Sequence, residues 1–157
     1  MKVLNSSQGI GGQLTDFRKL VESSERITFI GTAGFCTPFA ELMAYVLRNS
    51  DKQMTFIPGL SFDDARSIVS TSHGMQLGDP VDPHADTIVL LGGLAMPKTG
   101  VELTQIKDLI DQVLENSEKK LIIGVCFQSV FEKMKWLESI DFDYIIDADL
   151  NNNLLEV

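Results

Sequence analysis

Short apolar runs alternate along the chain with stretches in which apolar residues recur every three or four positions. The short runs are rich in β-branched and aromatic residues and end at Gly, Pro or Asp, which is typical of β-strands. They lie at residues 27–30, 54–57, 87–91, 121–125 and 144–148. The run at 87–91 resembles a strand that is buried on both faces. A brief edge strand is also expected at residues 75–77.

The stretches with helical spacing predict amphipathic helices between the strands. These helices are expected at about residues 14–21, 38–47, 62–70, 103–114 and 130–137. Thr37 would cap the second helix through its hydroxyl, and Pro38 suits its first position. Two other helix starts resemble capping boxes, and these are Ser61 with Asp64 and Thr99 with Glu102.

Alternating strands and helices of these lengths predict a single α/β domain over residues 1–157. We expect a three-layer sandwich with an open, mostly parallel sheet of five to six strands, in a Rossmann-like or flavodoxin-like order. The expected order across the sheet is 75–77, 54–57, 27–30, 87–91, 121–125, 144–148. The chain would reverse its direction across the sheet between strands 27–30 and 87–91.

Composition narrows the classes of function. The formal net charge is −9 and the 13 basic residues are scattered, so binding to nucleic acid or to anionic lipid is not expected. No apolar run is long enough for a membrane span, and the N-terminus lacks a secretory signal, so we expect a cytoplasmic protein. Its two cysteines should then be free thiols.

The reversal of strand order is where open α/β sheets bind ligands, beyond the C-terminal ends of the strands. Three loops rich in small residues are expected to meet there and to form a ligand-binding crevice. The candidate ligand-binding residues are Gly31, Thr32, Gly34, Cys36, Thr37, Gly92, Gly93, Lys98, Thr99, Gln128 and Ser129. Backbone N–H groups at the helix starts would favour a small anionic ligand. The glycine spacing lacks the third glycine of a dinucleotide fingerprint, and the chain has no P-loop, so the cofactor is unknown.

The segment from His73 to Asp86 is polar and rich in turns. It holds both histidines, His73 and His84, together with Asp79, Asp82 and Asp86. Such residues can bind a metal or supply a base, but their spacing matches no known ligand pattern. We expect solvated loop residues and no metal site.

Residues 87–93 and the segment Ile123-Gly124-Val125-Cys126-Phe127-Gln128 resemble the class I glutamine amidotransferase and DJ-1/PfpI superfamily. In that superfamily a strand ends in paired glycines, and a later strand carries a nucleophilic cysteine on a sharp elbow, Gly-x-Cys-x-Gly. The resemblance implies Cys126 as the catalytic nucleophile and Gly93 as an oxyanion donor. Gln128 replaces the second glycine of the elbow, and no histidine follows Cys126.

The Gly-Phe-Cys-Thr-Pro and Gly-Val-Cys-Phe-Gln loops, together with the length of the chain, also resemble a family of small uncharacterised archaeal proteins. That resemblance implies the same fold and a cytoplasmic location, but no activity.

Three functions remain open from the sequence. The leading hypothesis is a domain that binds an anionic metabolite or nucleotide across the three loops. The alternatives are a cysteine-dependent enzyme that uses Cys126, and a structural or regulatory subunit. A homodimer is the assembly we expect, because it is the commonest one for small domains.

Overall fold

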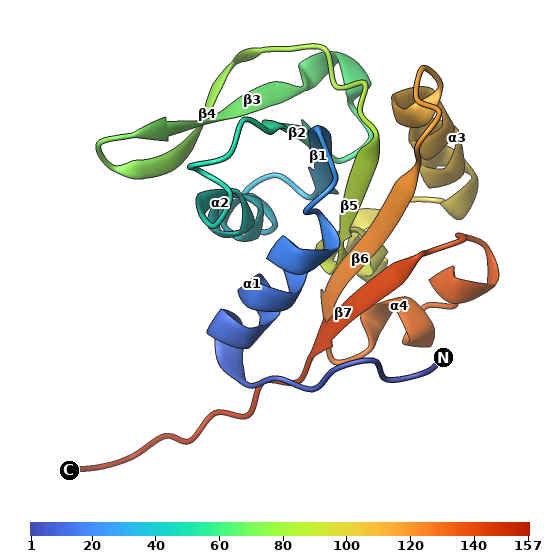
Figure 1. Ribbon diagram of the computed structural model, residues 1–157. Helices are drawn as coiled ribbons and strands as arrows, with labels where there is room; N and C mark the ends of the chain where they lie inside the picture. Colours follow the sequence, from blue (N-terminus) through green and yellow to red (C-terminus); the bar gives the residue numbers. More distant parts are fainter.

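The computed structural model describes residues 1–157 and contains one seven-stranded sheet (Figure 1). The strands are β1 (Arg26–Gly31), β2 (Gln53–Pro58), β3 (Arg66–Thr71), β4 (Gly74–Pro80), β5 (Thr87–Leu91), β6 (Leu121–Phe127) and β7 (Tyr144–Ala148). Their order across the sheet is β4-β3-β2-β1-β5-β6-β7. Five neighbouring strands are parallel to one another, and these are β2, β1, β5, β6 and β7. The strand β3 runs antiparallel to both of its neighbours, β2 and β4. The α/β class and the mostly parallel sheet are confirmed.

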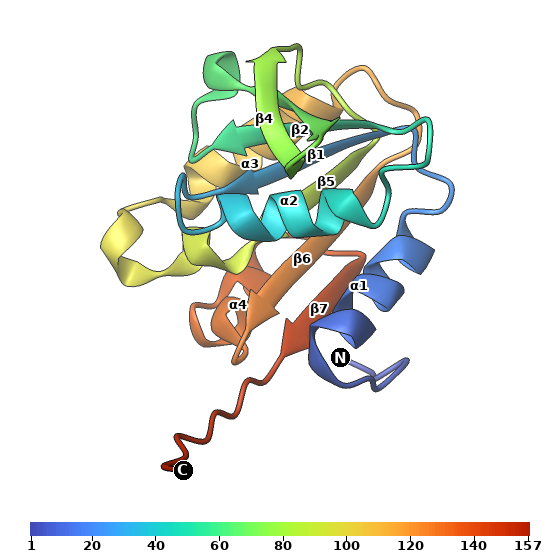
Figure 2. The ribbon, with the colours of Figure 1, turned by 90° about the vertical axis from the view of Figure 1, so that its left-hand side faces the viewer.

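Helices lie on both faces of the sheet (Figure 2). The α-helices are α1 (Gly9–Leu20), α2 (Thr37–Tyr45), α3 (Leu103–Leu114) and α4 (Val130–Lys133). Short 3₁₀ turns add η1 (Phe62–Asp64), η2 (Gly92–Ala95), η3 (Pro97–Thr99) and η4 (Trp136–Glu138). None of the helices has the length and apolar content that a membrane span requires.

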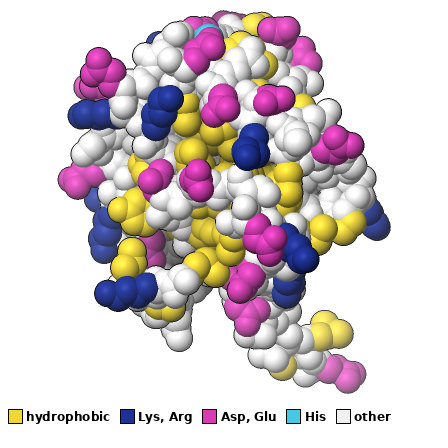
Figure 3. All heavy atoms as spheres, turned by 90° about the vertical axis from the view of Figure 1, so that its right-hand side faces the viewer, with side chains coloured by type: hydrophobic (Ala, Val, Ile, Leu, Met, Phe, Trp, Pro, Cys, Tyr) yellow, Lys and Arg dark blue, Asp and Glu magenta, His cyan; other side chains and the backbone are white.

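Each face of the sheet has its own hydrophobic core of 17 buried residues. The first core joins the sheet to α1 and α2, through residues such as Phe17 and Met43. The second core joins it to α3 and α4, through residues such as Ile106 and Phe131. Figure 3 faces the α3 and α4 side and shows a band of hydrophobic side chains between acidic and basic ones.

The predicted helix at residues 62–70 is wrong. Only the turn η1 forms, and β3 follows it as a strand between β2 and β4. The side chains of β3 alternate, because Ile68 is buried in the first core and Val69 is exposed. This period of two belongs to a strand, and β-branched side chains favour a strand over a helix. The sheet therefore has seven strands instead of the five or six expected, and β4 is longer than the predicted residues 75–77.

The helix starts differ from the predicted caps. Thr37 is the first residue of α2 and not its N-cap, and its Oγ1 accepts from the Gly34 N–H that precedes the helix. The side chain of Ser61, at the N-cap position of η1, makes no capping hydrogen bond. Thr99 donates to the carbonyl of Leu94 at 2.8 Å, while the capping box at α3 pairs Glu102 with Gln105. The helix α3 begins at Leu103, one turn after Thr99, because Thr99 is the last residue of η3 and is followed by Gly100, whose φ is +65°.

The last predicted helix, at residues 130–137, is broken into two turns. α4 ends at Lys133, and Lys135 has a φ of +60°, a conformation that stops an α-helix. The turn η4 then places Trp136 in the second core. After β7 the chain leaves the sheet and extends away from the rest of the molecule (Figures 1 and 2).

Candidate functional site

A crevice of about 400 Å³ opens at the C-terminal ends of β5 and β6, where the chain also enters α2 and α4. Eight of its twelve lining residues are hydrophobic, so the crevice suits the apolar part of a ligand. The lining residues are Phe35, Cys36, Phe39, Leu91, Gly92, Gly93, Met96, Val125, Phe127, Gln128, Val130 and Lys133.

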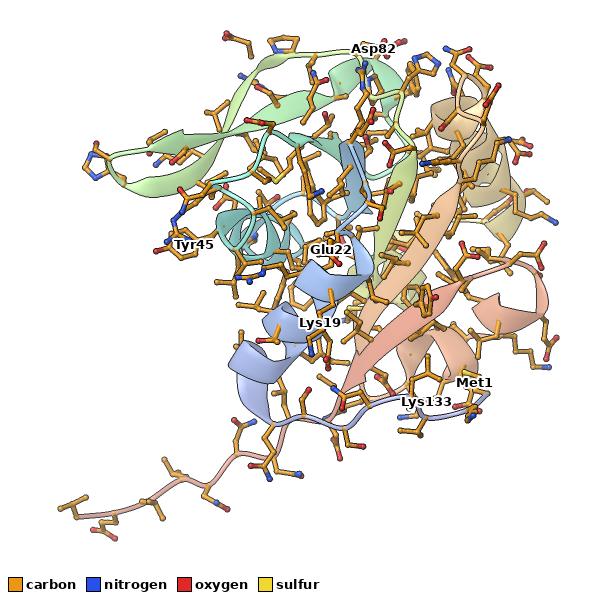
Figure 4. The ribbon with its side chains drawn as sticks, in the orientation of Figure 1. Met1, Lys19, Glu22, Tyr45, Asp82 and Lys133 are labelled. Atoms are coloured by element: carbon orange, nitrogen blue, oxygen red, sulfur yellow. The ribbon has the colours of Figure 1, made fainter.

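Lys133 is the only charged residue in this lining. It is the last residue of α4, and Figure 4 marks it at the end of the sheet where β6 and β7 finish. Phe35 and Met96 expose 63% and 41% of their surfaces, so two apolar side chains stand open to solvent beside the crevice. The chemistry of the crevice is therefore an apolar wall with one cation.

The paired glycines after β5 allow close packing with the two cysteines. A Cβ on Gly92 would lie 2.6 Å from the Cβ of Cys126, and a Cβ on Gly93 would overlap the Sγ of Cys36. Real Cβ atoms do not approach so closely, so a side chain at either position would push β5 away from its neighbours. Packing alone accounts for both glycines.

Two backbone donors of the loop from Gly31 to Thr37 are used in hydrogen bonds within the loop. Gly34 N–H donates to Thr37 Oγ1 at 3.1 Å, and Cys36 N–H donates to the Thr32 carbonyl at 2.9 Å. The N–H groups of Phe39 and Ala40 both donate to the Cys36 carbonyl. Since Pro38 has no N–H, the start of α2 offers fewer donors to an anion than the sequence suggested.

The structure brings four of the predicted ligand-binding residues together in the crevice lining. These are Cys36, Gly92, Gly93 and Gln128. Gly31 lies against Cys36, whose side chain leaves no room for a Cβ there, and Thr32 Oγ1 is 3.2 Å from Cys36 Sγ. Five others, Gly34, Thr37, Lys98, Thr99 and Ser129, do not line the crevice.

The turn after β6 is held in an unusual conformation at the edge of the crevice. Gln128 and Ser129 have φ angles of 52° and 57°, in the left-handed region that non-glycine residues rarely adopt. Asp147 on β7 stabilises this turn, because it accepts from Ser129 N–H at 2.9 Å and from Ser129 Oγ at 2.7 Å. Such backbone strain persists only where surrounding contacts hold it.

Cys126 lies inside β6, two residues before this turn, and it is not part of the crevice lining. Its side chain belongs to the second core and exposes 1% of its surface, whereas Cys36 belongs to the first core. Burial raises the pKa of the Cys126 thiol to about 12, and the Asp147 carboxylate beside it adds to this shift. Cys126 Sγ donates to Asp147 Oδ1 at 3.4 Å. At neutral pH the thiol is therefore protonated, which is the unreactive form.

The histidines do not converge on a metal site. His84 lies between two carboxylates, with Nε2 2.8 Å from Glu115 Oε1 and Nδ1 bonded to Asp82 Oδ1. Glu115 is the largest cause of a raised pKa at His84, and Asp82 adds to it. The two carboxylates approach opposite ring nitrogens, and no group of three or more His, Cys, Asp or Glu side chains is arranged to hold a metal ion.

Sequence reasoning missed several residues of the crevice. Phe39 lies in the helix predicted at residues 38–47, but the sequence does not show that its ring packs on that of Phe127, with 5.2 Å between the ring centroids. The sequence does not predict that Lys133 lines the crevice, because it shows a basic residue on a helix but not the direction in which that helix faces. Val125 and Leu91 were expected only as buried strand residues.

Comparison with known proteins places the chain in a family. The model of a family described as an uncharacterized protein conserved in archaea (DUF2124) matches residues 8–151. An uncharacterized protein of Methanothermobacter thermautotrophicus is 39% identical over 155 residues, which cover 99% of each chain. One from Methanocaldococcus jannaschii is 45% identical over 151 residues, covering 94% of this chain and 90% of its own.

A crystal structure of a protein of unknown function from Methanothermobacter thermautotrophicus has the same fold. It is 39% identical, with a TM-score of 0.93, and the match covers 100% of this chain and 99% of that one. The predicted resemblance to uncharacterised archaeal proteins is thus confirmed, while these matches do not support the local resemblance to amidotransferases and DJ-1. The chain belongs to this archaeal family of uncharacterized proteins, whose function is unknown.

Proposed function

We propose that the crevice binds a small molecule that has an apolar body and one anionic group. The observation that carries this proposal is the lining itself, which is mostly aromatic and aliphatic and includes a single cation, Lys133. A volume of about 400 Å³ lies within the range of about 300–1,000 Å³ that is usual for small-molecule sites. The apolar body would pack on Phe39 and Phe127, and the anion would pair with Lys133.

The position of the crevice supports the same proposal. We infer that the parallel strands follow the doubly wound, three-layer pattern in which β1 marks the reversal of strand order. The next strand along the chain, β2, pairs with one edge of β1, and β5 pairs with its other edge. In that pattern the flanking loops diverge beyond the strand ends and leave room for a ligand.

The anionic group is assigned to Lys133 and not to the start of α2. A molecule with a net charge of −9 repels anions in general, so an anionic ligand needs a local cation. At the start of α2, Pro38 has no N–H, and the N–H groups of Phe39 and Ala40 are already bonded to the carbonyl of Cys36. An apolar acid fits the crevice better than a nucleotide, because the lining has only one cation to pair with phosphates.

Cys126 supports no reaction in this crevice. Its thiol is buried on the other face of the sheet, and its raised pKa disfavours the thiolate that a nucleophile requires. Binding without cysteine chemistry is therefore the function that the geometry favours.

A thermal-shift experiment tests this proposal. We expect 3-phenylpropionate and octanoate to raise the melting temperature, because they would bind only the folded protein. The uncharged amides of the same acids should give a much smaller shift. In Lys133→Gln the acids should bind about tenfold more weakly, since a hydrogen bond to a charged group is worth about 1.5–3 kcal/mol.

Lys107→Gln is the matched control, since Lys107 is exposed on α3 and outside the crevice lining. It should bind the acids as the unchanged protein does. The proposal is wrong if no apolar acid stabilises the protein, or if Lys133→Gln binds the acids and the amides as the unchanged protein does.

A further inference from the structure

The segment after β7 carries a cluster of apolar side chains that the rest of the chain does not cover. Residues 149–157 form no helix, strand or turn, and all of them are exposed. Leu154 and Val157 are as exposed as in a free peptide, and Leu155 exposes 78% of its surface. Single exposed apolar residues are common on proteins, but three within four positions are typical of a binding surface. We call residues 150–157 the tail.

The tail and the crevice complement each other in charge and in apolar surface. Among the side chains of the tail only that of Glu156 is charged, and an apolar residue lies on each side of it. Lys133 is the only charged residue in the lining of the crevice, and most of the other lining residues are apolar. The exposed side chains of Phe35 and Met96 extend this apolar lining to the surface of the molecule.

The tail leaves the sheet at the same end as the crevice. Ala148, the last residue of β7, pairs with Phe127 of β6, and Phe127 lines the crevice. Figure 2 shows the tail leaving beside the C-terminal ends of β6 and β7. It then extends away from the molecule, and no turn folds it back toward its own crevice. The nine residues after Ala148 span up to about 30 Å when extended, so a second molecule that faces this end of the sheet lies within their reach.

We propose that the tail of one molecule binds in the crevice of a second copy of the chain, and that the exchange is mutual. The apolar side chains of the tail pack on Phe39 and Phe127, and Glu156 pairs with Lys133. A two-fold axis repeats each contact, so the dimer contains two such tails. The contact uses side chains, and the backbone amides of the tail stay unpaired. The inference rests on the proposed function in one respect, the assignment of Lys133 as the partner of an anion.

Sedimentation velocity over a range of protein concentrations tests the exchange. We expect the unchanged protein to dimerise. Leu154→Asp should dimerise at least tenfold more weakly, because the two-fold axis removes two buried leucine side chains at once. Val69→Asp is the matched control, because Val69 is an exposed apolar residue of β3 outside the crevice lining. It should dimerise as the unchanged protein does.

An exchange of charges distinguishes a contact between two copies from a tail that folds onto its own molecule. Lys133→Glu and Glu156→Lys each place like charges in both contacts, so each variant alone should dimerise about tenfold more weakly. A mixture of the two variants has an opposite pair in both contacts, so it should form a heterodimer as readily as the unchanged protein dimerises. Lys107→Glu makes the same change of charge outside the crevice lining, and it should dimerise normally.

The proposal is overturned if the unchanged protein is monomeric at all concentrations, if Leu154→Asp dimerises normally, or if the mixed charge variants do not associate. Thermal shift of Leu154→Asp with octanoate separates this inference from the proposed function, because that variant keeps the crevice lining. A monomeric protein that octanoate stabilises would refute the exchange and support the proposed function. A dimer that depends on the tail, with no stabilisation of Leu154→Asp by octanoate or 3-phenylpropionate, would support the exchange and refute the proposed function.

Discussion

Two glycine–cysteine contacts shape the inner end of the crevice. Gly93 lies against Cys36 on one face of the sheet, and Gly92 lies against Cys126 on the other. Both cysteines are free and buried, and the sheet separates them. The cysteines therefore act as small packing residues that let the loop after β5 lie close to its neighbours.

Gly93→Ala should destabilise the protein. Its added methyl group would overlap Cys36 Sγ and crowd Thr32 Oγ1, at 2.8 Å, so the free energy of unfolding should fall by about 1–3 kcal/mol. Urea unfolding followed by circular dichroism measures this change. Gly11→Ala is the matched control, because a Cβ there meets nothing within 4 Å, and it should stabilise α1 by about 0.5–1 kcal/mol. Equal stabilities of the two variants would contradict this account of the paired glycines.

Among the elements, the loop between β4 and β5 is tied to the end of α3 by one histidine. His84 bridges Asp82 in its own loop and Glu115, the residue that follows α3. Its ring also packs edge-on against Phe62, with 5.3 Å between centroids. The loop that sequence patterns left irregular is therefore held by charge as well as by hydrogen bonds.

This bridge should make stability depend on pH. The pKa of His84 is raised above 6.5, so its contribution is complete below that pH and is lost as the pH rises through the raised value. The pKa of Asp82 is lowered below 3.8, so its contribution is present above that pH and is lost as the pH falls through the lowered value. The bridge is strongest between these two limits.

We expect His84→Gln to flatten the stability profile above neutral pH. The unchanged protein should lose up to about 1 kcal/mol as the pH rises from 6.5 through the raised pKa of His84, a small effect because the carboxylates are largely exposed. Urea unfolding at several pH values measures it. His73→Gln is the control, because His73 lies in the β3–β4 turn, away from this bridge, and it should keep the profile. A profile that His84→Gln leaves unaltered would show that the bridge contributes nothing.

On the scale of the whole molecule, protection of backbone amides from hydrogen exchange should decrease from the centre of the sheet to its edges. β1 and β5 are buried on both faces and paired on both sides. β4 has one unpaired edge, and the chain after Ala148 has no helix or strand and is exposed. Hydrogen exchange followed by mass spectrometry should be slowest in β1 and β5, slower in β6 than in β4, and fastest after residue 149. Early hydrogen exchange in β5 would contradict a structure in which β5 lies at the centre of the sheet, between the two hydrophobic cores.

Local pattern was enough for the elements with strong periodicity. The apolar runs at 27–30, 87–91 and 121–125 are strands, and their relative order matches the structure. The stripe of Ile106, Ile110 and Val113 is the buried face of α3. The helix predicted at residues 62–70 is wrong because the few apolar residues there fit both a helical period and the period of two of a strand. Pairing with β2 and β4 makes residues 66–71 a strand.

The sequence by itself determined the α/β class, the mostly parallel sheet and the end of the sheet at which small residues gather, because burial of apolar periods leaves few other arrangements. Only the tertiary structure decided which side chains share a cavity. Alternation along β6 sends Phe127 to the crevice and Cys126 to the opposite core, and the single turn of α4 brings Lys133 to the crevice. The buried Nε2 of Gln13 is another example, because its lack of a hydrogen-bond partner follows from the folded chain around it and not from the sequence.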